Sequence, residues 1–379
     1  MPLTLRIEVE SGVFSWLRER CGWSVDEVAK RLRTSPEIVA AIETGERNPT
    51  LRQLKELSKA YKVPLASFLL TEPIPEPPLP KDYRMLPDRE DVFDKKTILA
   101  IRKARSLQEV GDELSNNIGY STVPTVSKTD LGDDPEKLAE RYRKDFRLTE
   151  KRQKKFKNSY EFFRHLRDKL EDMNILVFQL SMPVEDARGF ALTDKFPNII
   201  VINTKDSIEA RLFSLMHEFG HVLLGKTAID IPDVRISVRN DVEQWCNTFS
   251  SRFLLPKKFA EKIFDEYREN LTNTSTLNSL SSRYKVSKAM LLFNMYKMSF
   301  ISKGEFEETL DRYKPSEEKE RKRMGGIPQD RKCINEMGNK YVSIVANNYE
   351  NNHITYSDAL KHLSIKSKNF EKVLTKAGK

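Results

Sequence analysis

Residues 217–221 read His-Glu-Phe-Gly-His and combine side chains that can hold a metal ion and move a proton. Positions i and i+4 of an α-helix share one face, so His217 and His221 can present two imidazole nitrogens to the same ion. Glu218 lies on the same turn, where its carboxylate can reach a metal-bound water without binding the metal. This arrangement is typical of zinc hydrolases. The motif predicts one Zn²⁺ per chain and a general base at Glu218.

The alternative interpretation is a surface helix with two solvated histidines. The neighbours of the motif argue against it because they are mostly apolar: Leu212, Phe213, Leu215, Met216, Val222, Leu223 and Leu224. A helix with these residues is expected to be buried, and burying two unpaired imidazoles beside a carboxylate costs free energy. A bound metal ion compensates that cost, so the surrounding sequence favours zinc.

A hydrolytic zinc site uses a third protein ligand and leaves its fourth position for water. The next histidine after His221 is His353, far along the chain, so we expect a carboxylate from a second packed helix. Glu243 is the first choice because it lies among apolar residues of the segment 241–256, and Asp241 is the second. If Glu243 is not a ligand, it is an exposed first-turn glutamate favoured by the helix dipole.

Two further residues of this segment lie one turn beyond Glu243. Cys246 could act as a soft ligand, but a small core residue is the better interpretation. Asn247 is placed at i+4 from Glu243, where it can hydrogen-bond to the ligand carboxylate and orient it.

The elements that must position these side chains can be read from the periodicity. Short β-branched runs at 174–180, 187–193 and 198–204 predict three strands, and helices are expected over 207–224 and 241–254. Gly225 and Pro256 end the two helices. We expect the three strands to form a sheet over the zinc helix. A peptide could pair with an edge of such a sheet as an added strand, or the strands could only cap the core.

The segments that contain these strands and helices together resemble a known family. The block from EFFRHLRDKL through GFALTD, PNIIVIN and HEFGHVLLG to DVEQWCNTFSSRFLLP is similar to the ImmA/IrrE zinc metallopeptidases over about residues 95–300. The resemblance implies a gluzincin-like core in a largely α-helical chain. It also implies that His217, His221 and Glu243 bind zinc and that Glu218 is the catalytic base. The arginine that the family places later in the chain is replaced here by Asn294.

Residues 12–70 resemble an Xre/Cro-type helix-turn-helix domain. Ser24 and Ser35 are predicted helix N-caps, and Glu27 completes a capping box with Ser24. The expected recognition helix, 35–43, offers Glu37, Ala40 and Ala41, which cannot read base edges as Arg, Gln or Asn do. Backbone contacts to DNA are still expected from five basic residues: Arg31, Arg33, Arg47, Arg52 and Lys55. The alternative role for this module is protein docking or dimerisation.

Proline supplies the first boundary between domains. Residues 71–80 contain five prolines, which neither a helix nor a central strand tolerates. A charged segment at 314–326 predicts a second boundary. We therefore expect a helix-turn-helix domain over 1–70, a linker over 71–94, a peptidase domain over 95–313, and a charged linker with a small helical C-terminal domain over 314–379. The whole is expected to be mostly α-helical, with one small three-stranded sheet.

Composition restricts the class of protein. Three scattered cysteines, Cys21, Cys246 and Cys333, exclude a disulfide framework. No apolar run approaches the length of a membrane span, and the first residues lack the apolar core of a secretory signal, which predicts a cytoplasmic protein. The net charge of +9 permits contact with nucleic acid.

The sequence thus predicts a regulatory zinc endopeptidase that cleaves or controls a protein regulator such as a repressor. DNA could be bound through residues 1–70, and a homodimer is a further expectation. The competing hypothesis is a non-catalytic, antitoxin-like regulator of a toxin–antitoxin pair, in which zinc is structural or sensory. Family members with this order of domains resemble such genes.

Overall fold

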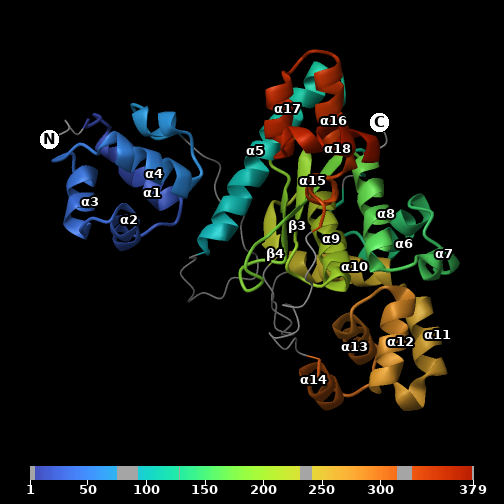
Figure 1. The fold of residues 1–379 in the computed structure, drawn as a ribbon. Coiled ribbons are helices and arrows are strands. Elements are labelled where there is room, and N and C mark those ends of the chain that lie inside the picture. Colours follow the sequence, from blue (N-terminus) through green and yellow to red (C-terminus); the bar gives the residue numbers. More distant parts are fainter. Residues whose placement is uncertain (1–4, 75–92, 128, 231–240, 314–326, 378–379) are drawn as a thin grey trace. The chain divides into compact units, whose positions relative to one another are not determined.

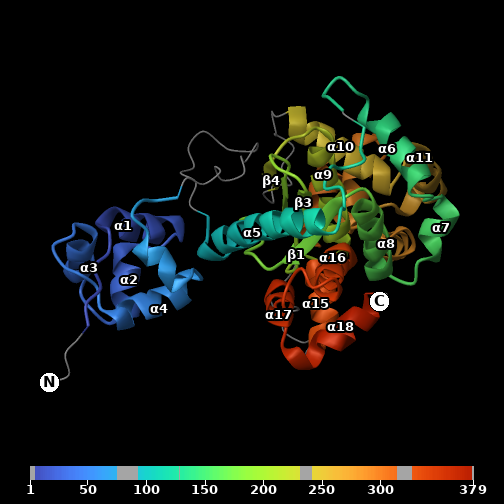
Figure 2. The same ribbon diagram turned by 90° about the horizontal axis from the view of Figure 1, so that it is seen from above.

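The computed structural model describes residues 5–74, 93–127, 129–230, 241–313 and 327–377 (Figures 1 and 2). The described residues of 1–79 and 87–103 form one unit, and those of 104–379 form a second. The charged segment 314–326 and most of the proline-rich segment lie outside the described residues, so the domain boundaries stay predictions. In the described part of the chain, no helix is both long and apolar enough to cross a membrane.

The first unit is a bundle of short helices around one apolar core. It contains α1 (Ser11–Arg20), α2 (Val25–Leu32), α3 (Pro36–Glu43), α4 (Leu51–Tyr61) and the 3₁₀ helix η1 (Leu65–Leu69). The capping box of Ser24 and Glu27 is confirmed, and Thr50 and Gln53 form a second one at the start of α4. The prediction for Ser35 is wrong in one respect: it precedes α3, but its hydroxyl accepts no backbone N–H of that helix.

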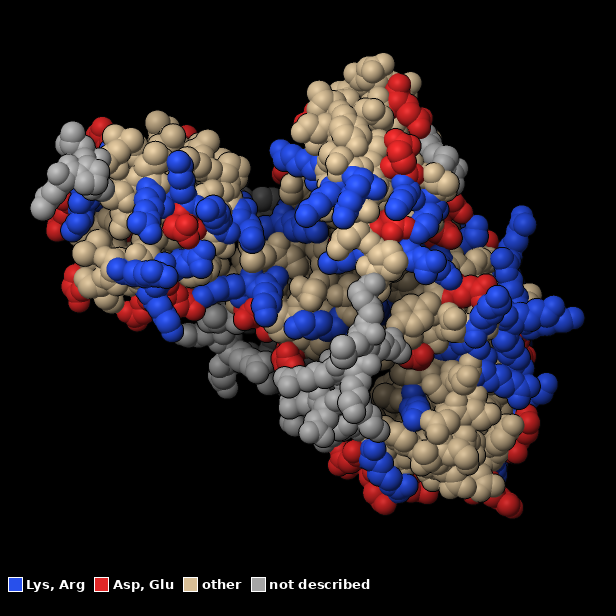
Figure 3. Space-filling view, viewed as in Figure 1, with Lys and Arg blue, Asp and Glu red and all other residues tan. Residues whose placement is uncertain are grey.

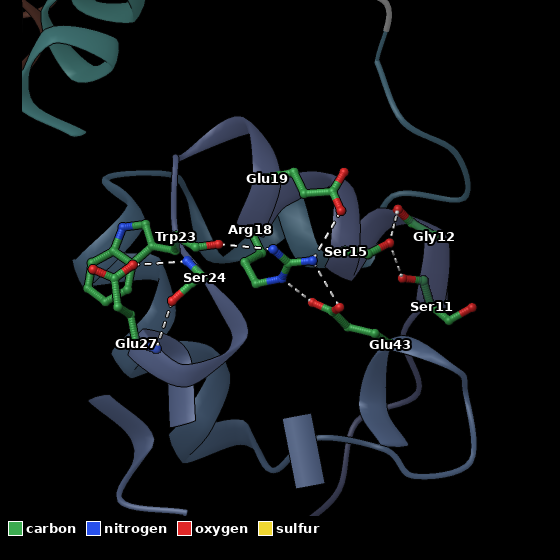
Figure 4. Close-up of polar contacts among 9 residues, drawn as sticks. All are labelled: Ser11, Gly12, Ser15, Arg18, Glu19, Trp23, Ser24, Glu27 and Glu43. Atoms are coloured by element: carbon green, nitrogen blue, oxygen red, sulfur yellow. Dashed lines mark hydrogen bonds and ion pairs between the residues drawn. The ribbon is translucent and has the colours of Figure 1, made fainter. Parts of the chain in front are cut away.

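Arg18 joins three parts of this unit (Figure 4). Its guanidinium donates to both carboxylate oxygens of Glu43, at 2.5 and 3.1 Å, and to the Trp23 carbonyl at 2.9 Å. The side chains of Arg18 and Glu43 are 12% and 14% exposed, so the pair is largely shielded from water. A bidentate arginine–carboxylate pair fixes orientation as well as distance. Arg18 therefore holds the end of α3 and the turn after α1 in one arrangement.

The second unit is built on a four-stranded sheet of order β1-β3-β2-β4. The three predicted strands are confirmed as β1 (Ile175–Leu180), β2 (Gly189–Leu192) and β3 (Asn198–Asn203). β1 and β3 are parallel, and β2 is antiparallel to both β3 and β4. The sequence did not predict β4 (Ala228–Asp230), because three residues are too few for a periodic signal.

Both faces of this sheet are covered, which explains why every residue of β1 and β3 is buried. Ile175, Val177 and Ile200 face a large core that they share with helices α8 (Ser159–Asp172) and α9 (Ile208–Leu223). On the opposite face, Phe178 packs edge-on against Tyr341 at 5.3 Å between ring centres. The sheet is therefore a buried platform on which α9 lies.

Figures 1 and 2 also show the other α-helices of the described residues. They are α5 (Lys95–Asn117), which begins in the first unit, α6 (Pro135–Asp145), α7 (Glu150–Lys155), α10 (Asp241–Leu254), α11 (Lys257–Glu266), α12 (Thr274–Tyr284), α13 (Lys288–Lys297), α14 (Lys303–Asp311), α15 (Gln329–Met337), α16 (Asn339–Glu350), α17 (Tyr356–Leu363) and α18 (Phe370–Lys376). Of these, α11–α14 form a group beside α10 in Figure 1. The predicted helical tail corresponds to α15–α18. It packs on β1 and α8, where Arg167 donates to the Asn335 carbonyl at 2.7 Å.

We predict that Arg18→Met lowers the stability of the first unit by about 1.5–3 kcal/mol, because the Glu43 carboxylate would remain shielded without its charged partner. Differential scanning calorimetry of the whole chain measures this change. Lys59→Met is the matched control, since the ion pair of Lys59 with Glu56 is long, at 3.8 Å, and exposed. Equal melting temperatures for the two variants would contradict the role of Arg18.

Candidate metal centre

The helix α9 carries His217, Glu218 and His221 inside the core. The Ser207 hydroxyl caps its start by accepting from the Ala210 N–H at 3.2 Å. Its end is closed at Gly225, which has a φ of +62°, and the Lys226 N–H donates to the His221 carbonyl at 2.9 Å. The apolar neighbours predicted to bury this helix do so, and all three motif side chains have no exposed surface.

The helix α10 packs closely on α9 because Gly220 has no side chain. A Cβ atom at Gly220 would lie 3.0 Å from Cys246 Sγ and 3.3 Å from Cys246 Cα. The two backbones can therefore approach only with a glycine on one side and a small residue on the other. The sequence analysis identified Cys246 as a small core residue but did not recognise the function of Gly220 inside the motif.

This close packing brings His217, His221 and Glu243 together. His217 Nε2 lies 3.2 Å from Glu243 Oε2, His221 Nε2 lies 3.1 Å from Glu243 Oε1, and the two Nε2 atoms are 3.2 Å apart. All three side chains are fully buried. Within the described part of the chain, these three residues form the group whose donor atoms could hold a metal ion.

The spacing of these donor atoms fits a tetrahedral zinc site. Zinc bonds of about 2.0–2.1 Å in tetrahedral geometry separate neighbouring ligand atoms by about 3.3 Å. The three observed edges, from 3.1 to 3.2 Å, are close to that value. Two imidazole nitrogens and one carboxylate are also a donor set that zinc uses in hydrolases. The residues present therefore fit the metal that the motif implies.

The electrostatics of Glu243 keep it ionised. Burial alone would raise the pKa of its carboxyl group, but the charges and hydrogen bonds of His217 and His221 outweigh burial and hold the pKa well below its ordinary range. A ligand carboxylate must be deprotonated to bind a metal. Asp241, the alternative ligand, is exposed at the first position of α10, and Asn247 is partly exposed.

Glu218 points toward the sheet, where it lies against Gly189 of β2. A Cβ atom at Gly189 would be 3.2 Å from Glu218 Oε1, 3.3 Å from Glu218 Cγ and 2.9 Å from the Val201 carbonyl oxygen. A larger residue would therefore displace either the carboxylate or the strand pairing. The sequence analysis placed the strand correctly but missed this glycine, because its role depends on a contact between β2 and α9.

The far end of α10 is fixed by buried polar side chains. Arg143 donates to the Phe253 carbonyl at 2.5 Å, and Gln153 donates to the Leu254 carbonyl at 2.9 Å. These bonds satisfy carbonyls that the last turn of a helix leaves unpaired. Burial lowers the pKa of Arg143 to about 10. α10 is therefore anchored at the end opposite Glu243.

Two family models match the chain over the segments that build these sites. The model of the IrrE N-terminal-like domain, an M78 peptidase family, matches residues 170–296, and a helix-turn-helix model matches residues 15–68. The chain joins an IrrE-like peptidase domain to an Xre-type helix-turn-helix domain. The suspected resemblance is confirmed. No curated protein matches the chain.

Asn294, where the resemblance implies an arginine, is buried on α13. It accepts from Ser251 Oγ at 3.0 Å and from Arg252 Nη1 at 3.0 Å. Arg252, on α10, also pairs with Glu136 at 2.7 Å. Asn294 thus joins α13 to α10.

The helix-turn-helix domain separates the five predicted DNA contacts into two sets. Arg31, Arg33 and Arg52 line one hollow between α2 and α4. Arg47 and Lys55 are exposed but do not line it. The role of all five residues at DNA stays a prediction.

We predict that His217→Ala abolishes metal binding and lowers the melting temperature, because a metal held only by the native state stabilises it by about 2.7 kcal/mol at a concentration a hundred times its dissociation constant. Metal analysis and melting curves with and without a chelator measure both effects. His165→Ala, which removes a histidine of α8 outside the donor group, should keep the metal. Metal retained in His217→Ala would contradict the site.

Proposed function

We propose that the protein is a zinc-dependent regulatory endopeptidase whose substrate is a protein regulator such as a repressor. The observation that carries the proposal is the triangle of His217, His221 and Glu243 beside the buried carboxylate of Glu218. A structural zinc site closes all four positions with protein ligands, whereas a hydrolytic site keeps one for water. Three protein donors and an adjacent carboxylate therefore support hydrolysis.

In peptide cleavage, three residues of the chain would bind the metal and a fourth would transfer the proton. His217, His221 and Glu243 would hold zinc, which would polarise a substrate carbonyl and lower the pKa of a water. Glu218 accepts a proton from the attacking water through its carboxylate and passes it to the leaving amine. Gly189 keeps the space in which that carboxylate lies. Burial of all four polar side chains excludes bulk water, which strengthens each electrostatic interaction.

The regulatory part of the proposal rests on the helix-turn-helix domain in the same chain. Helix-turn-helix domains bind DNA, and characterised ImmA/IrrE relatives cleave Xre-type repressors, so a DNA-bound regulator is the substrate class that both halves support. The second candidate is an antitoxin-like regulator in which zinc is structural or sensory. The composition of α3, which has no Arg, Lys, Gln or Asn, favours this candidate, because such a helix suits protein docking better than base reading.

We predict that Glu218→Gln keeps the zinc and the fold but lowers the cleavage rate by about two to four orders of magnitude, because only the proton acceptor is lost. Metal analysis and a cleavage assay on co-purified partners measure both properties. Glu243→Gln should instead lose zinc and stability together. If regulation in the cell survives Glu218→Gln but fails in His217→Ala, the peptidase proposal is wrong and the antitoxin-like regulator is preferred.

We predict that Gly189→Ala keeps zinc but slows cleavage on the order of a hundredfold, because a displacement of about 1 Å at a catalytic group can cost that much. Gly304→Ala is the matched control, since a Cβ atom there meets nothing within 4 Å. Metal content and single-turnover rates separate the two variants. An unchanged rate in Gly189→Ala would show that Glu218 does not need the space beside β2.

A further inference from the structure

A hollow of about 960 Å³ opens in the surface of the helix-turn-helix domain. It lies between α2 and the first turns of α4, and no residue of α3 contributes to it. Its lining is polar apart from Trp23 and Leu32 and comprises Trp23, Glu27, Lys30, Arg31, Leu32, Arg33, Thr50, Arg52, Gln53, Glu56 and Lys95. The hollow is therefore separate from the helix that would read bases in a related fold.

The charges around the hollow are mainly positive. The lining contains two carboxylates, Glu27 and Glu56, and five cations, Lys30, Arg31, Arg33, Arg52 and Lys95. Five positive and two negative charges leave a net charge of +3. Figure 3 shows Lys and Arg side chains spread over the face of this domain that it presents.

Each of the two carboxylates already forms an ion pair with a cation of the lining. Glu27 pairs with Lys95, and Glu56 pairs with Arg31 at 3.3 Å. Three cations remain: Lys30, Arg33 and Arg52 are exposed and have no acidic partner among the described residues. Cations converging on one concave surface without internal partners favour a ligand with several negative charges.

The surface of α3 has the opposite character. Its exposed Glu37 accepts a hydrogen bond from Ser35, which lowers the pKa of its carboxyl group and keeps it charged. Glu46 follows as a second exposed carboxylate. Glu46 lies beyond α3 and is followed by the exposed Arg47, so only Glu37 adds an exposed charge to α3 itself. The helix offers a polyanion no cation, whereas the hollow offers three unpaired ones.

We propose that this hollow is where the helix-turn-helix domain holds nucleic acid, and that it binds the phosphate backbone of duplex DNA without reading bases. This inference rests on the regulatory part of the proposed function, and it assigns DNA binding to the α2–α4 surface in place of α3. The duplex is favoured over a single strand because Lys95 covers the Trp23 ring at 4.3 Å, so the ring is not open for a base to stack on.

The test is a titration of the whole chain against a fluorescent duplex of random sequence at several salt concentrations. The variant Arg33→Gln/Arg52→Gln removes two of the unpaired cations. Lys59→Gln/Lys62→Gln is the matched control, with the same charge change on exposed residues that lie outside the hollow and are not among the five predicted DNA contacts. Melting curves confirm that both variants remain folded.

Removing two phosphate contacts should weaken binding roughly tenfold or more near 0.1 M salt and lower the slope of log affinity against log salt by about two. The control should change little. The proposal is overturned if the hollow variant binds as the wild type does, or if both variants weaken equally, which would mean a diffuse basic surface.

Two further results separate failure of this inference from failure of the proposed function. Loss of binding in the control alone would keep DNA binding but assign it to the C-terminal end of α4. No binding of the duplex by the wild type at low salt, together with binding of an acidic peptide that the hollow variant loses, would replace DNA with a protein partner. The cleavage assay with Glu218→Gln is independent of all these outcomes.

Discussion

The close approach of α9 and α10 is the constraint on which the rest of the candidate metal centre depends. Gly220 removes the side chain that would hold the two helices apart, and Cys246 fills the remaining space. Glu243 is then near enough for its two oxygens to meet His217 and His221 at 3.1–3.2 Å. A glycine inside a helix costs about 1 kcal/mol of helix stability relative to alanine, so its presence is explained by the contact it permits.

The sheet provides the second constraint, because it determines which backbone lies against Glu218 of α9. Both of its faces are covered, so β2 and β3 cannot shift without disturbing two layers of packing. Gly189 leaves room for the Glu218 carboxylate on this rigid surface. At the other end of α10, Arg143 and Gln153 hold the last carbonyls of the helix. The site is thus held by packing on one side and by buried hydrogen bonds on the other.

The helix-turn-helix domain uses charge in two different ways. The pair of Arg18 and Glu43 is nearly buried and serves to orient α3 (Figure 4). The cations of the α2–α4 hollow are exposed and unbalanced, and they cost little to keep solvated. A buried pair gives orientation, whereas exposed cations give long-range attraction that salt weakens. The two sets of residues can therefore be changed independently.

Local patterns in the sequence determined the elements and the candidate ligands. The i, i+4 spacing of His217 and His221, the apolar neighbours, the strand runs and the capping box of Ser24 are all short-range features, and the structure confirms the elements they predicted. Only the tertiary structure decided the functions of Gly220 and Gly189, the contact of Arg252 with Asn294, and the gathering of Arg31, Arg33 and Arg52 around one hollow. Each of these depends on contacts between residues distant in sequence, and helical or strand periodicity carries no information about which faces of two elements meet.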